Sequence, residues 1–536
     1  MKGHITRISG PTISTDIPGL KLYDRVRVGR NELLGEVIRL APDDAVVQVY
    51  EETQGLAIGE PAQSLGAALS LRLGPGMLGG IYDGLQRSLT ALLDTQGPFL
   101  QPGALPSLVA GSRWRFESAC QPGDQVQVGE LLGEVEELGF KHRIMAPRSG
   151  TLAEIESGDY NEDQSIGRFE DGTTISLYQE WPVREPRPCL EKHPPHEPLI
   201  TGQRAIDFLF TLARGGTAIF PGGFGTGKTV LEQSLAKCAA SDVVIYVGCG
   251  ERGNEMADML DEFTHLEDPW NSRPLMQRTV VVVNTSNMPV AAREASIYTA
   301  ATLGEYYRDM GYHVLLLADS LSRWAEALRE ISSALEEMPG EEGYPTYLHS
   351  RLATFMARAG SVTSLGNRHG SLSMVLSVSP PGGDFTEPVT QACLRNTGSF
   401  LMLDTALAQR RHFPAIHWGQ SFTRYATAQQ KLGMSVDSQW ENHKNLCRQL
   451  LQKEEALREV AEIVGQSGLQ ESDQLVMATA EQIRLQFLAQ NAFTDDAFSS
   501  PEQTFARIDK ILAAHNTQLA KVEADQTATE ANDAPG

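Results

Sequence analysis

The chain has 536 residues, enough for three or more domains, and its 41% hydrophobic and 21% charged residues are ordinary values for a globular protein. Its 45 basic and 68 acidic residues give a net charge of −23, which opposes non-specific binding to nucleic acid or anionic lipid. Every hydrophobic run is shorter than the roughly 18 residues needed to span a bilayer, and the start of the chain does not resemble a signal peptide. Six scattered cysteines without a C-x-x-C pair indicate reduced thiols in a cytosolic protein and give no spacing for zinc.

Residues 1–70 consist of short alternating hydrophobic runs, such as Val46–Tyr50, separated by glycine and proline turns. Alternation with a period of two is typical of β-strands that are buried on one face. A small barrel is the expected closure of these strands, because it removes their exposed edges. The sequence therefore predicts an N-terminal β-barrel.

Residues 111–185 form a second β-rich segment. The run Pro122-Gly123-Asp124 is a turn signal, and the segments 144–147 and 150–152 complete a hairpin-like pattern. This pattern resembles a biotinyl or lipoyl carrier module, but the tip between Arg143 and Arg148 has no lysine to carry the cofactor. We interpret the segment as a structural insert.

Residues 71–110 and 186–425 are predicted to form one nucleotide-binding domain. From about residue 190, strands alternate with helices, which indicates a mostly parallel sheet covered by helices on both faces, an α/β fold. Strands are expected at 217–220, 243–247, 279–284, 313–318 and 372–378. Helices are expected at 228–239, 254–263, 289–309, 321–334 and 346–358.

The strongest motif lies between the first of these strands and the first helix. It has the form G-x-x-x-x-G-K-[ST] and comprises Gly222, Gly223, Phe224, Gly225, Thr226, Gly227, Lys228 and Thr229, followed by Val230. In such a loop the backbone N–H groups and the positive end of the helix dipole converge on phosphate oxygens. The lysine reaches the β- and γ-phosphates, and the hydroxyl of the last residue ligates Mg²⁺. A glycine-rich turn that binds nothing is the alternative.

Two carboxylates follow strands of the same predicted sheet. Asp319 ends the buried strand at 313–318, where it is placed to hold Mg²⁺; alternatively it caps the following helix with Ser320. Glu251 follows the strand at 243–247 after a turn at Gly248-Cys249-Gly250, where it is placed to polarise a water for attack on the γ-phosphate. Arg252 is a candidate for stabilising charge on the phosphoryl oxygens. An ion pair on a solvated loop is the alternative for these last two residues.

The end of the chain has only helical signals. In residues 426–515, runs such as Leu446-x-x-x-Leu450-Leu451 and Ile483-x-Leu485-x-Phe487-Leu488 predict a small helical bundle. Residues 516–536 are rich in Ala, Thr, Glu, Asp and Asn and lack aromatic residues, and the composition predicts a disordered tail.

Several long runs together carry a family resemblance. The runs are 221–230, 248–256, 287–298, 319–332 and 379–385. They resemble the catalytic A subunit of V/A-type rotary ATPases, and the match covers nearly the whole chain. The β-rich insert resembles the extra domain that distinguishes these A subunits from the β subunit of F-type enzymes.

The resemblance implies a role for each candidate residue. Lys228 and Thr229 match nucleotide and magnesium contacts, Glu251 matches the carboxylate that activates water, and Arg252 matches its charge-stabilising neighbour. Asp319 matches the second magnesium anchor. Phe413 matches an aromatic that packs on adenine; the alternative is a loop aromatic buried in the core. The implied ligands are Mg²⁺ with ATP or ADP.

The resemblance also implies partners. They are B subunits in an alternating hexamer, one of which supplies an arginine to the site, together with central-shaft and peripheral-stalk subunits and a membrane sector that moves H⁺ or Na⁺. The expected location is the cytoplasmic face of a membrane, reached through the complex. Two departures from the family pattern are Gly223, where proline or alanine is usual, and the segment 394–401, which lacks the usual aromatic residues.

Three rival functions were weighed. A related hexameric secretion or export ATPase would lack the insert at 111–185. A nucleic-acid translocase would need a basic channel, which the charge of −23 disfavours. A non-catalytic nucleotide-binding subunit would lack Lys228 or Glu251, and both are present.

Overall fold

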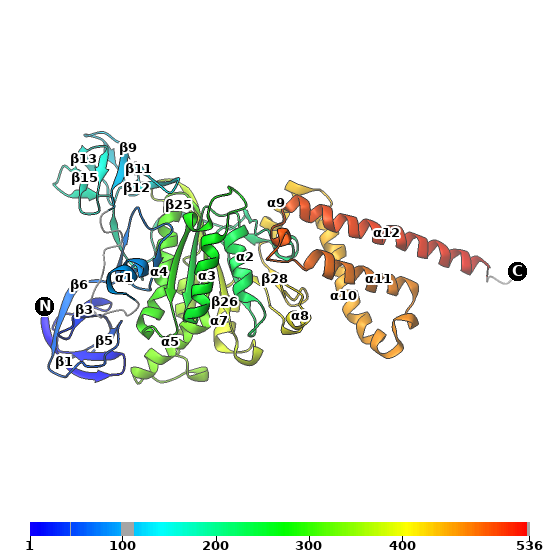
Figure 1. The fold of residues 1–536 in the computed structure, drawn as a ribbon, viewed down its shortest axis with the longest axis horizontal. Coiled ribbons are helices and arrows are strands. Elements are labelled where there is room, and N and C mark those ends of the chain that lie inside the picture. Colours follow the sequence, from blue (N-terminus) through cyan, green and yellow to red (C-terminus); the bar gives the residue numbers. More distant parts are fainter. Residues whose placement is uncertain (43, 98–111, 533–536) are drawn as a thin grey trace. The chain divides into compact units, whose positions relative to one another are not determined.

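The computed structural model describes residues 1–42, 44–97 and 112–532 of the chain (Figure 1). The pattern of contacts divides the chain into two units. The first unit comprises Met1–Pro194, Arg214–Ile219 and Ser241–Thr397, and the second comprises Pro195–Ala213, Phe220–Ala240 and Gly398–Gly536. This division places the helix after the phosphate loop in the second unit, whereas the sequence analysis assigned residues 186–425 to one domain. The five sequence-based segment boundaries remain predictions.

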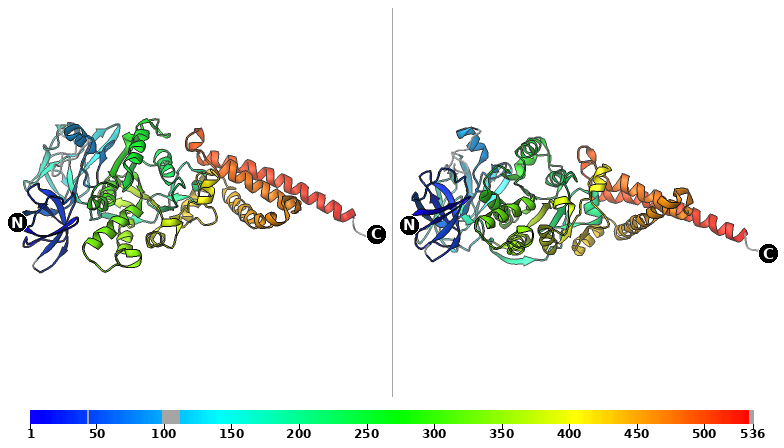
Figure 2. Two further views of the ribbon diagram at one scale, coloured as in Figure 1. Left: turned by 60° about the horizontal axis from the view of Figure 1, so that its bottom comes forward. Right: turned by 90° about the horizontal axis from the view of Figure 1, so that it is seen from below.

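The N-terminal strands of the first unit close into a barrel, which confirms the predicted fold (Figure 2). Neighbouring strands follow the order β1-β2-β5-β4-β3-β6. The inward side chains, among them Val26, Val37 and Val47, are fully buried. The strands are β1 (Lys2–Ser9), β2 (Thr12–Thr15), β3 (Asp24–Val28), β4 (Leu33–Leu40), β5 (Ala45–Val49) and β6 (Pro61–Ala68).

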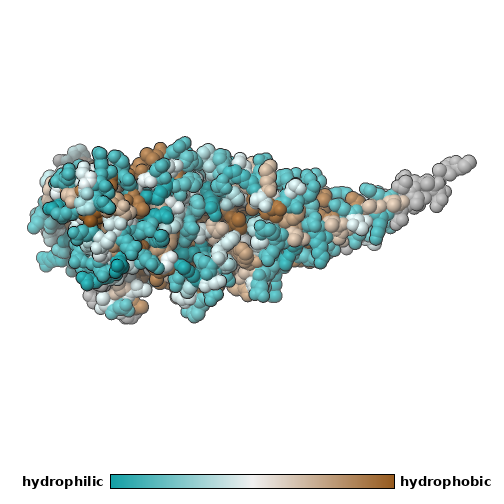
Figure 3. All heavy atoms as spheres, turned by 90° about the horizontal axis from the view of Figure 1, so that it is seen from above, coloured by the Kyte–Doolittle hydropathy of each residue, from teal (hydrophilic) through white to brown (hydrophobic). Residues whose placement is uncertain are grey.

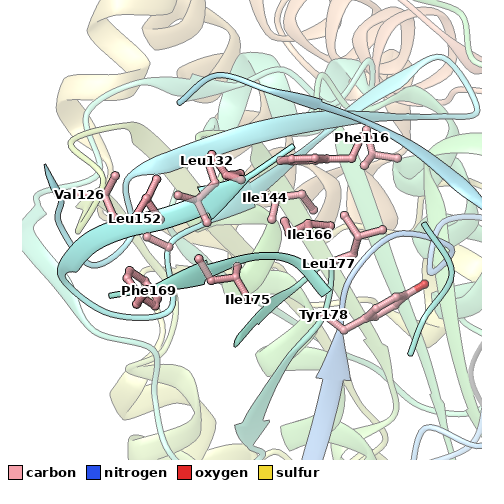
Figure 4. Packing of buried hydrophobic residues seen from close by; sticks show 13 residues of the cluster. Phe116, Val126, Leu132, Ile144, Leu152, Ile166, Phe169, Ile175, Leu177 and Tyr178 are labelled. Atoms are coloured by element: carbon pink, nitrogen blue, oxygen red, sulfur yellow. The ribbon is translucent and has the colours of Figure 1, made fainter. Parts of the chain in front are cut away.

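The insert is a sandwich of two four-stranded sheets, in the orders β10-β13-β15-β16 and β12-β11-β9-β14. Figure 4 shows the side chains of both sheets meeting in one hydrophobic layer, with Leu132 and Ile144 from one sheet and Leu152 and Phe169 from the other. The strands are β9 (Trp114–Ser118), β10 (Gln125–Val126), β11 (Leu131–Glu137), β12 (Phe140–Met145), β13 (Gly150–Ile155), β14 (Gly158–Tyr160), β15 (Ser165–Phe169) and β16 (Thr174–Ser176).

The hairpin expected from the segments 144–147 and 150–152 is wrong. β12 pairs with β11, whereas β13 pairs with β10 and β15 in the opposite sheet. Ile144 and Leu152 bury the same core from opposite sides, so the chain changes sheet between them. Alternation predicted both strands correctly, but it does not say which strands pair.

The central sheet of the first unit is mostly parallel, in the order β26-β24-β22-β23-β8, with β25 antiparallel to β26 and β18 antiparallel to β25. Strands buried on both faces read as continuous hydrophobic runs, as in Val243–Val247 and Val314–Ala318. The bounds are β8 (Ile81–Tyr82), β18 (Cys189–His193), β22 (Val243–Cys249), β23 (Thr279–Asn284), β24 (His313–Asp319), β25 (Gly360–Ser364) and β26 (His369–Val378), and β7 (Ser70–Leu73) pairs separately with β17 (Gln179–Pro182).

Helices flank this sheet, and the predicted alternation of strands and helices is confirmed (Figure 1). β8 joins the sheet beside β23, whereas residues 98–110 of the predicted domain lie outside the described residues. The helices are α1 (Leu89–Gln96), α3 (Gly253–His265), α4 (Val290–Asp309), α5 (Leu321–Ala334), α6 (Leu348–Met356) and α7 (Pro388–Asn396), with short helical turns at Leu275–Arg278, Glu341–Gly343 and Pro381–Gly383.

The second unit is mainly helical. It contains α2 (Lys228–Cys238), α8 (Thr405–Gln409), α9 (Ala426–Val436), α10 (Trp440–Val464), α11 (Glu471–Gln482) and α12 (Pro501–Asn532), the π-helical segments η1 (Ala205–Leu209) and η6 (Ile483–Leu488), and 3₁₀ turns at Gln466–Gly468 and Asp495–Ala497. Short strands are β19 (Pro198–Leu199), β20 (Leu212–Ala213), β27 (Ser399–Phe400) and β28 (Phe422–Thr423), and β21 (Thr217–Pro221) runs from the first unit into the second.

The disordered tail expected at 516–536 is wrong for residues up to 532. Helix α12 continues through Asn532, and residues 533–536 lie outside the described residues. The segment contains no glycine or proline before Pro535, and its alanines and glutamates favour a helix that has already started. Low hydrophobicity was therefore a poor guide here, because extending an existing helix avoids the cost of nucleating one.

Hydrophilic residues predominate on the face shown in Figure 3. Within the part of the chain that the structure describes, no helix is both long and hydrophobic enough to cross a bilayer.

Candidate functional site

The predicted phosphate loop joins β21 to α2 in the form that the motif requires. Gly225 and Gly227 have φ angles of 77° and 82°, a left-handed conformation that glycine adopts without strain. Gly227 is the N-cap of α2, so Lys228 is the first residue of the helix and Thr229 the second. The backbone N–H groups of this first helical turn have no carbonyl partners within the helix, which makes the position suitable for an anion.

The side chain of Lys228 folds back over the loop. Its Nζ donates hydrogen bonds to the carbonyls of Gly222 and Gly223, at 2.7 and 2.8 Å. The hydroxyl of Thr226, which is 1% exposed, donates to the Gly223 carbonyl at 2.9 Å. These bonds hold the ammonium within the loop, at the start of the helix.

A cavity of about 620 Å³ lies beside the loop in the second unit. Phe413 lines it, is 40% exposed, and lies close enough to Gly227 that a Cβ there would be 3.2 Å from its ring. The alternative of a core aromatic is therefore wrong for Phe413. The cavity has the size of ordinary ligand sites, which run from about 300 to 1,000 Å³. Other lining residues are Gly225, Val230, Leu231, Arg411, Leu485, Gln490, Asn491 and Phe493.

The sequence analysis missed the wall of this cavity formed by residues 485–496. It assigned Leu485 to a buried helical face, but Leu485 is 62% exposed and Phe493 is 76% exposed. The helical segment η6 has π geometry, which shifts the side chains away from the period of 3.6 residues that the prediction assumed. Only the exposed aromatic Phe493, next to a run of polar residues, was a sequence signal.

The two candidate carboxylates lie at one edge of the sheet in the first unit. Asp319 is the last residue of β24 and pairs in register with Gly248 of β22, three residues before Glu251. Asp319 is 3% exposed and accepts a hydrogen bond from Ser377 at 2.7 Å. Ser320, not Asp319, occupies the N-cap of α5, so the alternative of a helix cap is wrong. Glu251 lies in the turn between β22 and α3, anchored where its carbonyl accepts from the Ser286 N–H.

Arginines surround the turn that carries Glu251. Arg252 is the N-cap of α3, is largely exposed, and lies 3.5 Å from Glu255. A Cβ on Gly250, which has a φ of 75°, would lie 2.7 Å from Arg323 Cβ and 3.1 Å from Arg293 Cδ. The hydrogen bond to Glu326, together with the charges of Glu326 and Glu251, raises the pKa of Arg323 despite partial burial. The sequence analysis did not single out Arg293 or Arg323, although both lie in the runs that carry the family resemblance.

Burial makes the thiol in the same turn unreactive. Cys249 is fully buried, and its burial raises its pKa to about 12. Its Sγ lies 3.7 Å from the Arg293 carbonyl, and it accepts a hydrogen bond from Ser296 at 3.5 Å. Because only the thiolate is a nucleophile, Cys249 has a structural role here.

Within each unit, the structure thus brings together one part of the predicted site. The second unit holds Lys228, Thr229, Val230 and Phe413 around the loop and its cavity, and the first unit holds Glu251, Arg252 and Asp319 at the sheet edge.

The departure at Gly223 leads to a testable prediction. Its φ is outside the left-handed region, and a Cβ there would meet only the Thr405 hydroxyl, at 3.3 Å. We expect Gly223→Ala to stabilise the protein by about 0.4–1 kcal/mol, because alanine restricts the unfolded chain more than glycine does. The measurement is the midpoint of thermal unfolding.

Gly225→Ala is the matched control. A Cβ at Gly225 would meet nothing within 4 Å, but its φ of 77° costs alanine about 1–2 kcal/mol. Opposite shifts of the two midpoints are expected. A lower midpoint for Gly223→Ala would show that contact with Thr405 outweighs the gain in entropy.

Comparison with known families identifies four regions of the chain. The ATP synthase alpha/beta family matches with its nucleotide-binding domain over residues 202–423 and with its beta-barrel domain over residues 5–66. The barrel-sandwich domain of ATP synthase alpha/beta subunits matches residues 105–184. The C-terminal domain of V and A type ATP synthases matches residues 430–530.

Among solved structures, the chain is similar to the assembled ATPase EscN of the type III secretion system of enteropathogenic E. coli. The TM-score is 0.68 with 23% identity, over 95% of this chain and 99% of that chain. At this identity the likeness shows the fold alone.

Curated relatives are far more similar. The V-type ATP synthase alpha chain of Anaeromyxobacter dehalogenans is 51% identical, over 98% of this chain and 92% of the relative. The A-type ATP synthase subunits A of Methanopyrus kandleri and Methanoregula boonei are each 50% identical; they cover 96% and 92% of this chain, and the match covers 89% and 84% of their own length. With this identity over nearly the full length of both chains, and with the V/A-type C-terminal domain, this chain belongs to the A (alpha) subunit family of A-type and V-type ATP synthases.

Proposed function

We propose that this chain is the catalytic subunit of a rotary ATPase that hydrolyses or synthesises ATP in step with H⁺ or Na⁺ transport across a membrane. The observation that carries the proposal is the loop at the start of α2, with Lys228 held over it and a cavity lined by Phe413 beside it. A phosphate chain on the loop and a base in the cavity together match a nucleoside triphosphate. Phe413 is proposed to pack on the adenine, as an exposed aromatic can do at low entropic cost.

Lys228 and the N–H groups of the loop residues 222–230 are proposed to bind the phosphates. The Thr229 hydroxyl and the Asp319 carboxylate are proposed to hold Mg²⁺, since both offer the oxygen ligands that this ion prefers. When bound, Mg²⁺ neutralises part of the charge on the phosphate oxygens. Burial and the hydrogen bond from Ser377 fix the orientation of the Asp319 carboxylate for this task.

Glu251 is proposed to activate water. Its carboxylate accepts a proton from the water that attacks the terminal phosphorus, and in synthesis the same group returns the proton. Arg252 is proposed to stabilise the negative charge on the phosphoryl oxygens, which its exposed position at the start of α3 leaves it able to reach by rotating its side chain. These roles join residues of both units.

The family suggests the assembly. We propose B-type subunits that alternate with this chain in a hexamer and contribute an arginine to its site, central-shaft and peripheral-stalk subunits, and a membrane sector to which the complex attaches on the cytoplasmic side. The likeness to EscN keeps a secretion ATPase as the second candidate. The barrel-sandwich insert and the V/A-type C-terminal domain favour the synthase.

Copurification separates these candidates. We expect an affinity-tagged chain, extracted gently with membranes from its host, to bring a B-type subunit in equal amount together with stalk and membrane-ring subunits. The measurement is mass spectrometry of the intact complex with an assay of ATP hydrolysis. A stable hexamer of this chain alone, without a ring, would contradict the synthase proposal and favour the export ATPase.

A further inference from the structure

Arg204 is a fully buried arginine that the proposed mechanism does not use. It is 1% exposed and precedes the short helix η1 in the second unit. Burial of a guanidinium is costly unless every part of it is paired, so its partners indicate what the position requires.

All the partners of Arg204 lie in the segment 487–496. Its guanidinium donates to both carboxylate oxygens of Asp496, at 2.6 and 2.8 Å, and to the carbonyls of Phe487 and Ala489, each at 2.7 Å. Its backbone N–H donates to the side-chain carbonyl of Gln490 at 2.8 Å. Since η6 ends at Leu488, the cation also lies at the carbonyl end of a helical segment, where positive charge is favourable.

The same segment is tied to the residues that precede Arg204. Gln490 donates from Nε2 to the Gly202 carbonyl at 2.9 Å, and Gln203 donates to the Ala497 carbonyl at 3.0 Å. Partial burial disfavours the ionised form of Asp496, but the hydrogen bonds and charge of Arg204 outweigh it and hold the pKa of Asp496 below its ordinary value. Residues 202–204 and 487–497 therefore form one clasp.

This clasp carries one wall of the cavity beside the phosphate loop. Ala489, Gln490, Phe493 and Asp496 all line that cavity. The backbone N–H of Gln490 also donates to the carbonyl of Phe413 at 2.8 Å, and Phe413 lies against Gly227 of the loop. A continuous set of bonds thus runs from Arg204 to the aromatic residue that faces the cavity.

We propose that Arg204 is a positioning residue for the nucleobase: it holds the segment 489–496 and, through Gln490, Phe413 in place as the walls of the base cavity. The inference rests on the proposed nucleotide site. Arg204 touches neither base nor phosphate. It sets the affinity for the base and leaves the phosphate loop, which contacts the phosphates through its own backbone and Lys228, unchanged.

The test compares a ligand that has a base with one that has none. Dissociation constants of MgADP and of magnesium pyrophosphate are measured by calorimetry on the full-length chain and on Arg204→Lys. Lysine keeps the charge but cannot bridge Asp496 and two carbonyls at once. We expect the affinity for ADP to fall about 10- to 100-fold, as for a displaced binding group, and the affinity for pyrophosphate to change less than about 2-fold.

Two further variants keep the test decisive. Asp496→Asn keeps the bonds of Arg204 to the Phe487 and Ala489 carbonyls, so it preserves the fold better, and we expect a smaller loss confined to ADP. Arg507→Ala is the matched control, because Arg507 also pairs with Asp496, at 3.1 Å, but is 46% exposed. Exposed pairs contribute about 0–1 kcal/mol, so we expect at most about a 5-fold change.

In the complete ATPase, Arg204→Lys is expected to raise KM for ATP and to leave kcat within about 3-fold, because the reacting phosphate is still held by the loop. Equal losses of ADP and pyrophosphate affinity, or no loss of ADP affinity, would overturn the inference. Failure of the wild-type chain to bind ADP would instead contradict the proposed nucleotide site, so the two failures are distinguishable.

Discussion

Glu251→Gln is expected to reduce ATP turnover at least about 100-fold while ATP still binds, because glutamine has the shape of glutamate but cannot accept a proton from water. The Glu251 side chain follows a turn fixed by hydrogen bonds from Gly250 to the Asn284 carbonyl and from Ser286 to its own carbonyl. The amide is therefore expected to occupy the same place. The measurement is steady-state hydrolysis by the purified complex, with ATP affinity from a separate binding experiment.

Asp258→Asn is a matched control for Glu251→Gln. It also converts a carboxylate to an amide, on the helix α3 that follows the turn, at an exposed position. Surface substitutions of this kind change free energies by about 0.5 kcal/mol or less, which corresponds to about a 2-fold change in rate. Turnover by Glu251→Gln as fast as by the control would remove Glu251 from the proposed role.

Lys228→Ala is expected to weaken ATP binding about 100-fold. Charge-assisted hydrogen bonds are worth about 1.5–3 kcal/mol each, and the loss of about 3 kcal/mol corresponds to about two orders of magnitude in the dissociation constant. The two loop carbonyls that accept from Nζ are exposed to water once the lysine is removed, so we expect the loop to keep its fold. The measurement is calorimetric titration of the full-length chain with MgATP.

Lys237→Ala provides the control for this variant. Lys237 lies in the last turn of the same helix, about 13 Å along the axis from Lys228. We expect ATP affinity within about 2-fold of the wild type, as is usual for surface positions. If the two lysine variants bound ATP equally well, the phosphate loop would not be the site of the triphosphate.

The two experiments separate binding from chemistry because they address different units. Lys228 belongs to the second unit, with the cavity and Phe413, and Glu251 belongs to the first, with Asp319. We expect loss of affinity from changes in the second unit and loss of turnover from changes at the sheet edge of the first. The Arg204 variants extend the first group to a residue remote from the phosphates.

The sequence by itself determined the elements whose signals are local. Strands such as Val243–Cys249 and Thr279–Asn284, and the helix that begins at Lys228, follow from hydrophobic runs, periodicity and the glycines of the loop, all of which act over a few residues. The long runs around Glu251 and Asp319 were enough to indicate the family that the comparisons then confirmed.

Only the tertiary structure decided which distant segments meet. It paired β13 with β10 and β15 instead of β12, continued α12 to Asn532, exposed Leu485 on a π-helical segment, and joined Arg204 to residues almost 300 positions away. Periodicity tells a side chain to be buried, but it does not name the partner, because pairing is selected by the free energy of the whole packed core. The buried arginine shows this best: its local sequence gives no sign of a partner, and its burial is possible only where the fold supplies a carboxylate and two carbonyls together.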